Sequence, residues 1–357
     1  MNSNSPGLSR GQTEMNYPLL ILSQDYELFF QKSGTVEQCL IKPTDMLVDF
    51  AKKNGIVVTF FIDAGMLTSM RRLARTVPSI SKDLSRLQKH IEFLHISGHE
   101  IALHVHPHWE DTKWSRGAWD FSGTRYQLGE FSQSEVEEII RRYSSELREI
   151  VGGNVHSYRA GGFCIEPFDL VRDALLENGI TIDSSVVPGA ILKDRAKGYD
   201  FAEVTDAPWW KFQESPSSPN SAGEFLEIPI TPLVLPSWHY WSRAVDRVLR
   251  KQPAGVLGDG LAKSLGIREI ARRLAGAGRV SELSADVPKS EHLVSSRIDQ
   301  QNRKVWQIMG HPKLLGKKSF ERLQVLIDRK AIKCFCSVSG LAHQIRTAGR
   351  FSNMDEV

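Results

Sequence analysis

Residues 17–27 read YPLLILSQDYE, an apolar run that ends in the acids Asp25 and Glu27. A short apolar run of this kind is typical of a buried strand. IVVTFFIDAG (56–65) and HEIALHVHPHW (99–109) repeat the pattern, and helical stretches such as PTDMLVDFAKKNG lie between the runs. Strands that alternate with helices of about 10–15 residues predict right-handed βαβ units and a mainly parallel sheet.

The number of such units favours a closed or nearly closed barrel. Further strand-like segments are HSYRAGG (156–162), ITIDSS (180–185), FLEIPITP (225–232), KVWQIMGH (304–311) and IKCFCSVS (332–339). We expect the barrel to occupy residues 17–346, with a helical insertion at 236–302 that contains two basic amphipathic stretches. Residues 1–16 and 347–357 are predicted to be tails.

The composition is that of a folded soluble protein, with 41% hydrophobic and 24% charged residues among 357. A formal net charge of +3 calls for no nucleic-acid partner, and we predict no obligate protein partner. The sequence contains no signal-peptide pattern and no apolar segment of membrane-spanning length. The four cysteines form no disulfide framework. We therefore expect a cytoplasmic protein with reduced thiols.

Polar side chains end five of the predicted strands. In a barrel of parallel strands, these ends meet at one rim, where functional groups collect. The side chains are Asp25 and Glu27, then His104, His106 and His108, followed by Arg159, Asp183 and His311. Each has an ordinary structural explanation by itself, such as a helix cap, a solvated histidine or an ion-pair partner. Their convergence on one rim favours a catalytic site.

The histidine spacing favours a metal. His104 and His108 are four residues apart, and a turn near Pro107 would bring both rings to one ion. Two imidazoles and one carboxylate leave coordination positions open, as in catalytic zinc sites. His106 shares a strand face with His104, so it is either a competing ligand or a group that supports a ligand. The remaining carboxylate would take a proton from metal-bound water.

The order of these motifs resembles the polysaccharide deacetylases with the NodB-homology fold, carbohydrate esterase family four. D-x-E, TFFIDAG, H-x-x-x-H, YRAGG, DSS and a late HP follow one another over about residues 17–345. DYELFF, DSSVVPG and GHPKLL look most like the WbmS-like branch, which is found among bacterial surface-polysaccharide genes. The resemblance implies a distorted (β/α)7 barrel and a divalent metal, most often zinc.

The resemblance also implies roles for individual residues. Asp25 matches the catalytic base and Arg159 the arginine that steadies it, while His311 matches the acid that protonates the leaving amine. Asp183 lies where the family places an acid that orients such a group. The metal ligands implied are Glu27, His104 and His108.

Three departures from the family pattern suggest a changed substrate. Tyr26 separates the two acids, Val105 replaces a hydroxyl residue, and RAGGF (159–163) stands where R-x-P-Y is usual. We expect an amino-sugar substrate that is nucleotide-linked or lipid-linked, the latter with peripheral contact to the inner membrane face. The alternatives are removal of a formyl or another acyl group, or an inactive barrel that binds a glycan or a protein.

Overall fold

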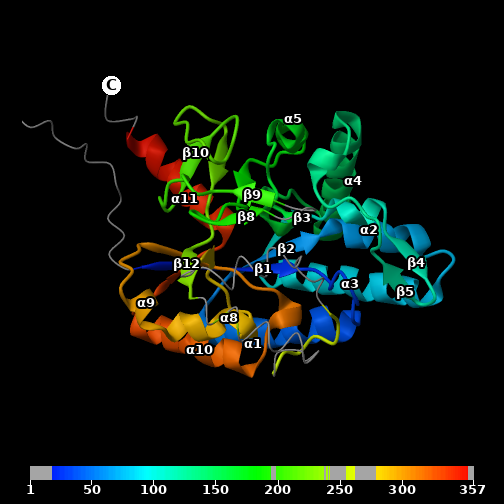
Figure 1. Cartoon of the computed structure of the whole chain (residues 1–357), viewed down its shortest axis with the longest axis horizontal. Coiled ribbons are helices and arrows are strands. Elements are labelled where there is room, and N and C mark those ends of the chain that lie inside the picture. Colours follow the sequence, from blue (N-terminus) through cyan, green and yellow to red (C-terminus); the bar gives the residue numbers. More distant parts are fainter. Residues whose placement is uncertain are drawn as a thin grey trace, which may run out of the picture.

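The computed structural model describes residues 18–193, 198–236, 239, 241, 255–261 and 279–352 (Figure 1). Its largest sheet has nine strands, eight of them parallel, and seven of these follow one another in the order β11-β7-β6-β3-β2-β1-β14. These are β1 (Leu19–Tyr26), β2 (Val58–Asp63), β3 (Glu100–Val105), β6 (Ser157–Ala160), β7 (Ile182–Asp183), β11 (Phe225–Glu227) and β14 (Val305–Ile308). β10 (Trp210–Phe212) pairs antiparallel with β11, and β15 (Cys334–Phe335) pairs parallel with β1.

Helices follow most of the parallel strands. They are α1 (Lys42–Asn54, preceded by the π-helix η1, Glu37–Ile41), α2 (Ala64–Leu73), α3 (Pro78–Ile96), α4 (Gln133–Val151), α5 (Asp169–Glu177), α10 (Lys317–Arg329) and α11 (Val338–Ser352). Local signals fix several ends: the Ser132 hydroxyl accepts from the first turn of α4, and Gly55 and Gly152 end α1 and α4 with φ near 65°. α1 and α10 lie side by side (Figure 1), with the rings of Phe50 and Phe320 5.6 Å apart.

Extended backbone outside the named strands curls the sheet into a distorted barrel. Thr231 N–H donates to the Gln307 carbonyl on β14 at 3.1 Å, and Thr231 O accepts from Leu283 N–H at 2.8 Å. Met309 N–H then donates to Leu283 O at 3.1 Å. These bonds link the β11 side of the sheet back to β14, so the predicted α/β barrel class is confirmed.

The barrel interior has an apolar layer and a polar layer. Successive side chains of a strand point to opposite faces, so Leu19 and Ile21 on β1 face inward together with Ser23 and Asp25. Leu19 and Ile21 belong to an apolar cluster that includes residues of α11, which closes one end of the barrel. The buried polar side chains Ser23 and Asp25 continue the same face toward the carboxyl end of the strand. The polar layer thus lies toward this rim, whereas Thr59, Glu100 and Ser157 form a separate hydrogen-bonded group beside the start of α11 at the other end.

Three two-stranded sheets and several short helices lie outside the nine-stranded sheet. The two-stranded sheets are β4 (Lys113–Ser115) with β5 (Ala118–Asp120), β8 (Ile191–Lys193) with β9 (Gly198–Asp200), and β12 (Pro232–Leu235) with β13 (Arg279–Glu282). The short helices are η2 (Pro107–Glu110), η3 (Leu128–Glu130), η4 (Gly161–Phe163), α8 (Val287–Ser290), η5 (Glu291–Val294), α9 (Ser296–Asp299) and η6 (Pro312–Leu314). α8 and η5 pack on α10.

The predicted insertion at 236–302 is described only in part. Its basic stretches, 243–252 and most of 268–279, lie outside the described residues, as do residues 1–17. α11 continues past residue 347 into the segment predicted as a tail. Within the described residues, no helix is both long and apolar enough to cross a membrane. In that same part of the chain, the four cysteines are free thiols.

Candidate metal and acid–base site

Four strands deliver ionisable side chains to the carboxyl rim. Asp25 and Glu27 come from the end of β1, and His104 and His106 come from the end of β3. Arg159 lies on β6, and His311 follows β14. Asp25, Glu27, His104, His106 and Arg159 are all buried, and the His311 side chain is 20% exposed. His311 is therefore the member of the group that meets the surface.

Glu27, His104 and His106 form a compact group, called here the Glu27 cluster. One ligand atom from each lies within 4.8 Å of the others. Glu27 Oε2 is 3.3 Å from His104 Nε2 and 2.6 Å from His106 Nε2. His104 and His106 reach the same side because they are two residues apart on extended backbone.

The third member of this cluster is His106, whereas the ligand set expected from the sequence contains His108. The extended backbone persists through His106, and the 3-10 helix η2 begins at Pro107. After that turn, the His108 ring lies 5.1 Å from the His106 ring between centroids, and both rings contact Phe30, at 4.6 Å for His106 and 4.4 Å for His108. The sequence predicts His106 as either a competing ligand or a supporting group, and alternation along the strand favours its place in the cluster.

The donor atoms of the Glu27 cluster suit a divalent cation. His104 Nδ1 lies 2.9 Å from the Arg159 carbonyl, which can only accept, so Nδ1 carries the proton and Nε2 of the neutral ring carries a lone pair. Among the described residues, neither that Nε2 nor Glu27 Oε2 has a partner with hydrogen-bond geometry. Two lone pairs facing each other in a buried site need a proton or a metal cation between them. Burial lowers the pKa of His104, but the carboxylates of Asp25 and Glu27 outweigh burial and raise it to about 8, so a bound metal would displace a proton from Nε2.

Zinc has a matching size. Zn–N and Zn–O bonds of about 2.0–2.1 Å in tetrahedral geometry place ligand atoms about 3.3–3.4 Å apart. The His104–Glu27 separation of 3.3 Å meets this spacing, and the His106–Glu27 separation of 2.6 Å is shorter. A metal bound to both of these atoms would require the His106–Glu27 separation to lengthen. Burial lowers the pKa of His106 to about 4, which keeps that imidazole neutral as a ligand must be.

A glycine makes room for the His106 ring. A Cβ on Gly161 would lie 2.5 Å from His106 Nδ1 and 2.6 Å from the Val105 carbonyl. A side chain at position 161 would therefore displace the His106 ring, so the first glycine of RAGGF leaves room for this imidazole.

Lys313 completes the surroundings of Glu27, and sequence reasoning missed it. Its buried ammonium lies 2.7 Å from Glu27 Oε1 and donates to the Leu28 carbonyl at 2.7 Å. Burial alone would raise the pKa of Glu27, but Lys313 and His106 beside it lower that pKa well below its usual range. Lys313 thus occupies Oε1 and leaves Oε2 to face the histidines. The only signal in the sequence was a charged residue directly after the HP pair.

Asp25 is held as an ionised carboxylate. Arg159 donates to Asp25 Oδ1 at 2.7 Å and is itself fixed by the Ser184 carbonyl at 2.8 Å. Burial raises the pKa of Asp25, but Arg159 and His104 outweigh it and the pKa is lowered. Oδ2 faces the cluster, 3.7 Å from His104 Nε2 and 3.9 Å from His311 Nε2. This is the geometry expected of a base that an arginine steadies.

Asp286 orients His311. Its Oδ2 lies 2.9 Å from His311 Nδ1, and its Oδ1 accepts from the His311 backbone N–H at 2.7 Å. Burial opposes protonation of the ring, but Asp286 outweighs burial and raises the pKa of His311. Because Nδ1 is engaged, the transferable proton is on Nε2.

The orienting acid expected from the sequence was Asp183, and this expectation needs correction. Asp183 Oδ1 accepts from the Ser185 hydroxyl at 2.6 Å, and Asp183 pairs with the buried Glu227 on the neighbouring strand. Burial raises the pKa of both carboxyls, as expected for two acids that share a proton. Asp183 therefore belongs to the barrel interior. Asp286 was missed because it lies inside the segment read as an insertion.

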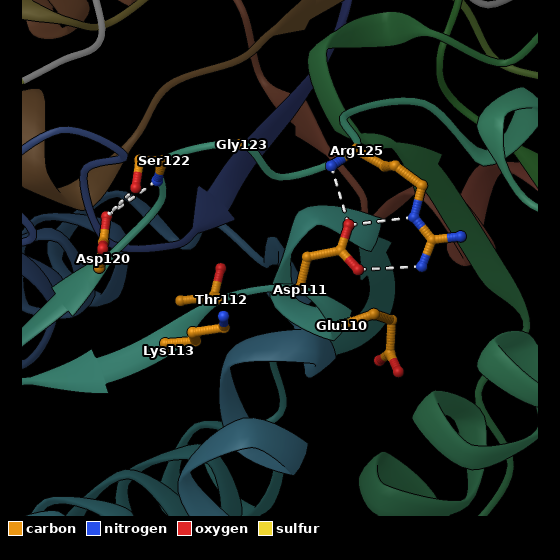
Figure 2. Close-up of a pocket in the computed structure, with 8 residues that line it drawn as sticks. All are labelled: Glu110, Asp111, Thr112, Lys113, Asp120, Ser122, Gly123 and Arg125. Carbon is orange, nitrogen blue, oxygen red and sulfur yellow. Dashed lines mark hydrogen bonds and ion pairs between the residues drawn. The ribbon is translucent and has the colours of Figure 1, made fainter.

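A polar cleft of about 640 Å³ is lined by residues from the end of η2, the β4–β5 hairpin and the loop after it (Figure 2). Its lining residues are Glu110, Asp111, Thr112, Lys113, Asp120, Ser122, Gly123 and Arg125. Figure 2 shows Arg125 clamped on Asp111, with Nε and Nη2 at 3.0 and 2.9 Å from the carboxylate oxygens. The cleft shares no residue with the Glu27 cluster, so we assign it no chemistry.

One of the similar solved structures supports the fold. A protein from Mycobacterium smegmatis assigned to the polysaccharide deacetylases superposes with a TM-score of 0.51 at 14% identity, covering 96% of this chain and 95% of that one. The Bc1960 peptidoglycan N-acetylglucosamine deacetylase gives 0.39 at 12% identity (90% and 86% covered), and Puue allantoinase gives 0.42 at 13% (89% and 87%). No protein-family model matches this sequence, and no curated protein is a detectable relative.

Proposed function

We propose that the chain is a metal-dependent hydrolase that removes the acetyl group from an N-acetylated amino sugar. One observation carries the proposal: the Glu27 cluster, with its N,N,O donor set, lies against a steadied carboxylate and an oriented imidazole. Asp25 Oδ2 is 3.7 Å from His104 Nε2, and His311 Nε2 is 3.6 Å from Glu27 Oε1. Arg159 and Asp286 hold these two groups in place.

Glu27, His104 and His106 would hold the metal. A bound divalent ion, with zinc favoured by this donor set, polarises the amide carbonyl and makes a coordinated water more acidic. Lys313 keeps Glu27 ionised and turned so that one oxygen faces the histidines. The ligand assignment therefore rests on three side chains and one supporting ammonium.

Asp25 is the general base in this proposal. Its free oxygen takes a proton from the attacking water, whose oxygen bonds to the amide carbon. Arg159 on the other oxygen holds the carboxylate in place and keeps it ionised before the attack.

His311 is the general acid. When the C–N bond breaks, Nε2 gives its proton to the nitrogen, and acetate and a free amine result. Asp25 Oδ2 and His311 Nε2 are 3.9 Å apart, a spacing at which they can serve two atoms bonded to the same carbon. Asp286 stabilises the protonated ring until the transfer.

The substrate class follows from the resemblance to the WbmS-like branch and from the surface. We propose a nucleotide-linked or lipid-linked amino sugar used in assembling a bacterial surface polysaccharide. Trp209 and Trp241 are 38% and 55% exposed, and such rings stack on sugars or lie at a bilayer interface. The same site would also release a formyl or another acyl group, since only the pocket decides that choice.

One observation favours a different class of function, an inactive barrel that binds a glycan or a protein. The Lys313 ammonium already supplies positive charge to Glu27. If the Lys313 ammonium takes the place of a metal, Glu27 and Lys313 form a buried ion pair. The barrel would then bind a glycan or a protein without catalysing a reaction. Metal content separates the two possibilities.

The test is acetate release from acetylated nucleotide sugars and lipid-linked sugars by zinc-loaded protein, followed by mass spectrometry. We expect loss of one acetyl mass with the wild type, and a large loss of rate in Asp25→Asn at unchanged zinc content. Zinc-loaded wild type that releases no acyl group from any of these donors would refute the enzymatic proposal.

A further inference from the structure

A second group of metal-ligand atoms lies within the segment predicted as an insertion. His239 follows β12, and Glu291 and His292 begin η5. His239 and His292 are buried, and Glu291 is 40% exposed at its side chain. We call these three residues the His239 cluster. It shares no residue with the Glu27 cluster.

We propose that the His239 cluster binds one divalent cation of the zinc type. Its three donor atoms form a nearly regular triangle: His239 Nδ1 and His292 Nε2 are 3.2 Å apart, and Glu291 Oε1 is 3.5 and 3.6 Å from them. Tetrahedral zinc with bonds of about 2.0–2.1 Å places its ligands about 3.3–3.4 Å apart. All three separations lie close to that value.

A hydrogen bond between the two imidazoles explains the arrangement less fully. One proton between His239 and His292 accounts for their 3.2 Å contact. It does not account for a carboxylate oxygen that is equally distant from both nitrogens, beyond hydrogen-bond reach of either. A single cation between the three atoms accounts for all three separations.

The ion would brace the acid side of the deacetylase-like site. Arg322 on α10 donates to Ser290 at 2.8 Å and Arg329 donates to the Val294 carbonyl at 2.8 Å, so η5 is tied to α10. Asp286, which orients His311, lies five residues before Glu291 on the same short segment. A cation that joins His239 to this segment closes a loop of roughly fifty residues. Because the entropy cost of closing a loop rises with its length, a cross-link across a loop this long stabilises the fold more than one across a short loop.

The experiment is zinc titration of the full chain after chelator treatment, with zinc counted by mass spectrometry. We expect two zinc ions per chain in the wild type and in His343→Ala, a control at an exposed histidine of α11. His239→Ala/His292→Ala and His104→Ala/His106→Ala should each hold one. A variant with all four changes should hold none.

The outcomes separate this proposal from the proposed function. If His239→Ala/His292→Ala holds as much zinc as the wild type, the second site is refuted, whatever the first site does. If the variant does not fold, cobalt(II) is loaded into His104→Ala/His106→Ala instead. Tetrahedral cobalt absorption there supports the His239 cluster, and its absence refutes it. Loss of the Glu27 cluster alone would abolish deacetylation and leave metal binding at the His239 cluster unchanged.

Discussion

Replacement of Lys313 by methionine tests the environment of Glu27. Both partners of the pair are buried, with 6% of each side chain exposed. Breaking a buried ion pair by removing one partner costs about 3–5 kcal/mol, since the remaining charge stays buried. An unfolding entropy of about 2.1 cal/mol/K per residue gives about 0.75 kcal/mol/K for 357 residues. The Tm of metal-free Lys313→Met should therefore fall by about 4–7 °C.

Differential scanning calorimetry measures this shift, and Lys317→Met is the matched control. Lys317 is 89% exposed and lies 3.7 Å from Glu321 one helical turn away. Exposed pairs of this type contribute about 0.3–0.5 kcal/mol, so its Tm should stay within about 1 °C. Saturating zinc should recover part of the loss in Lys313→Met because a cation again lies beside Glu27. A metal-free Lys313→Met protein as stable as the control would refute the reasoning.

Three further changes probe the catalytic groups and the ligand set. Asp25→Asn should reduce kcat by about 10²–10⁴ at unchanged zinc content, because general-base catalysis contributes about that factor; zinc analysis beside an acetate assay checks it. Asp286→Asn removes the carboxylate that raises the pKa of His311, so the alkaline limb of the kcat/KM profile, where His311 loses its proton, should move to lower pH. An unmoved limb would exclude His311 as the acid. Gly161→Ala should weaken zinc binding because the new Cβ displaces the His106 ring. Gly153→Ala is the control, since a Cβ there meets nothing within 4 Å. Zinc affinity is measured by competition with a chromogenic chelator, and equal affinities of the two variants would count against His106 as a ligand.

Alternation and the meeting of parallel strand ends made much of the site predictable. The apolar run before Asp25 requires a buried strand, and period two then places Asp25 on the inner face. Parallel strands end at one rim, so His104, Arg159 and His311 had to lie near one another. None of this needed knowledge of loop conformation.

Details set by single turns were not predictable in the same way. The choice between His106 and His108 depends on where extended backbone gives way to η2, a change at one residue. Asp286 reaches His311 from a short connection whose sequence carries no periodic signal. Lys313 is a single residue whose role depends on the bend at η6. Tertiary contacts, not local propensity, fix these three positions.

Anomalous diffraction at the zinc edge, from crystals of the zinc-loaded protein, tests the central claim most directly. We expect a peak bonded to Glu27 Oε2, His104 Nε2 and His106 Nε2, on the side that Asp25 Oδ2 and His311 Nε2 face. A rim without a peak, with the Lys313 ammonium still paired to Glu27, would contradict it.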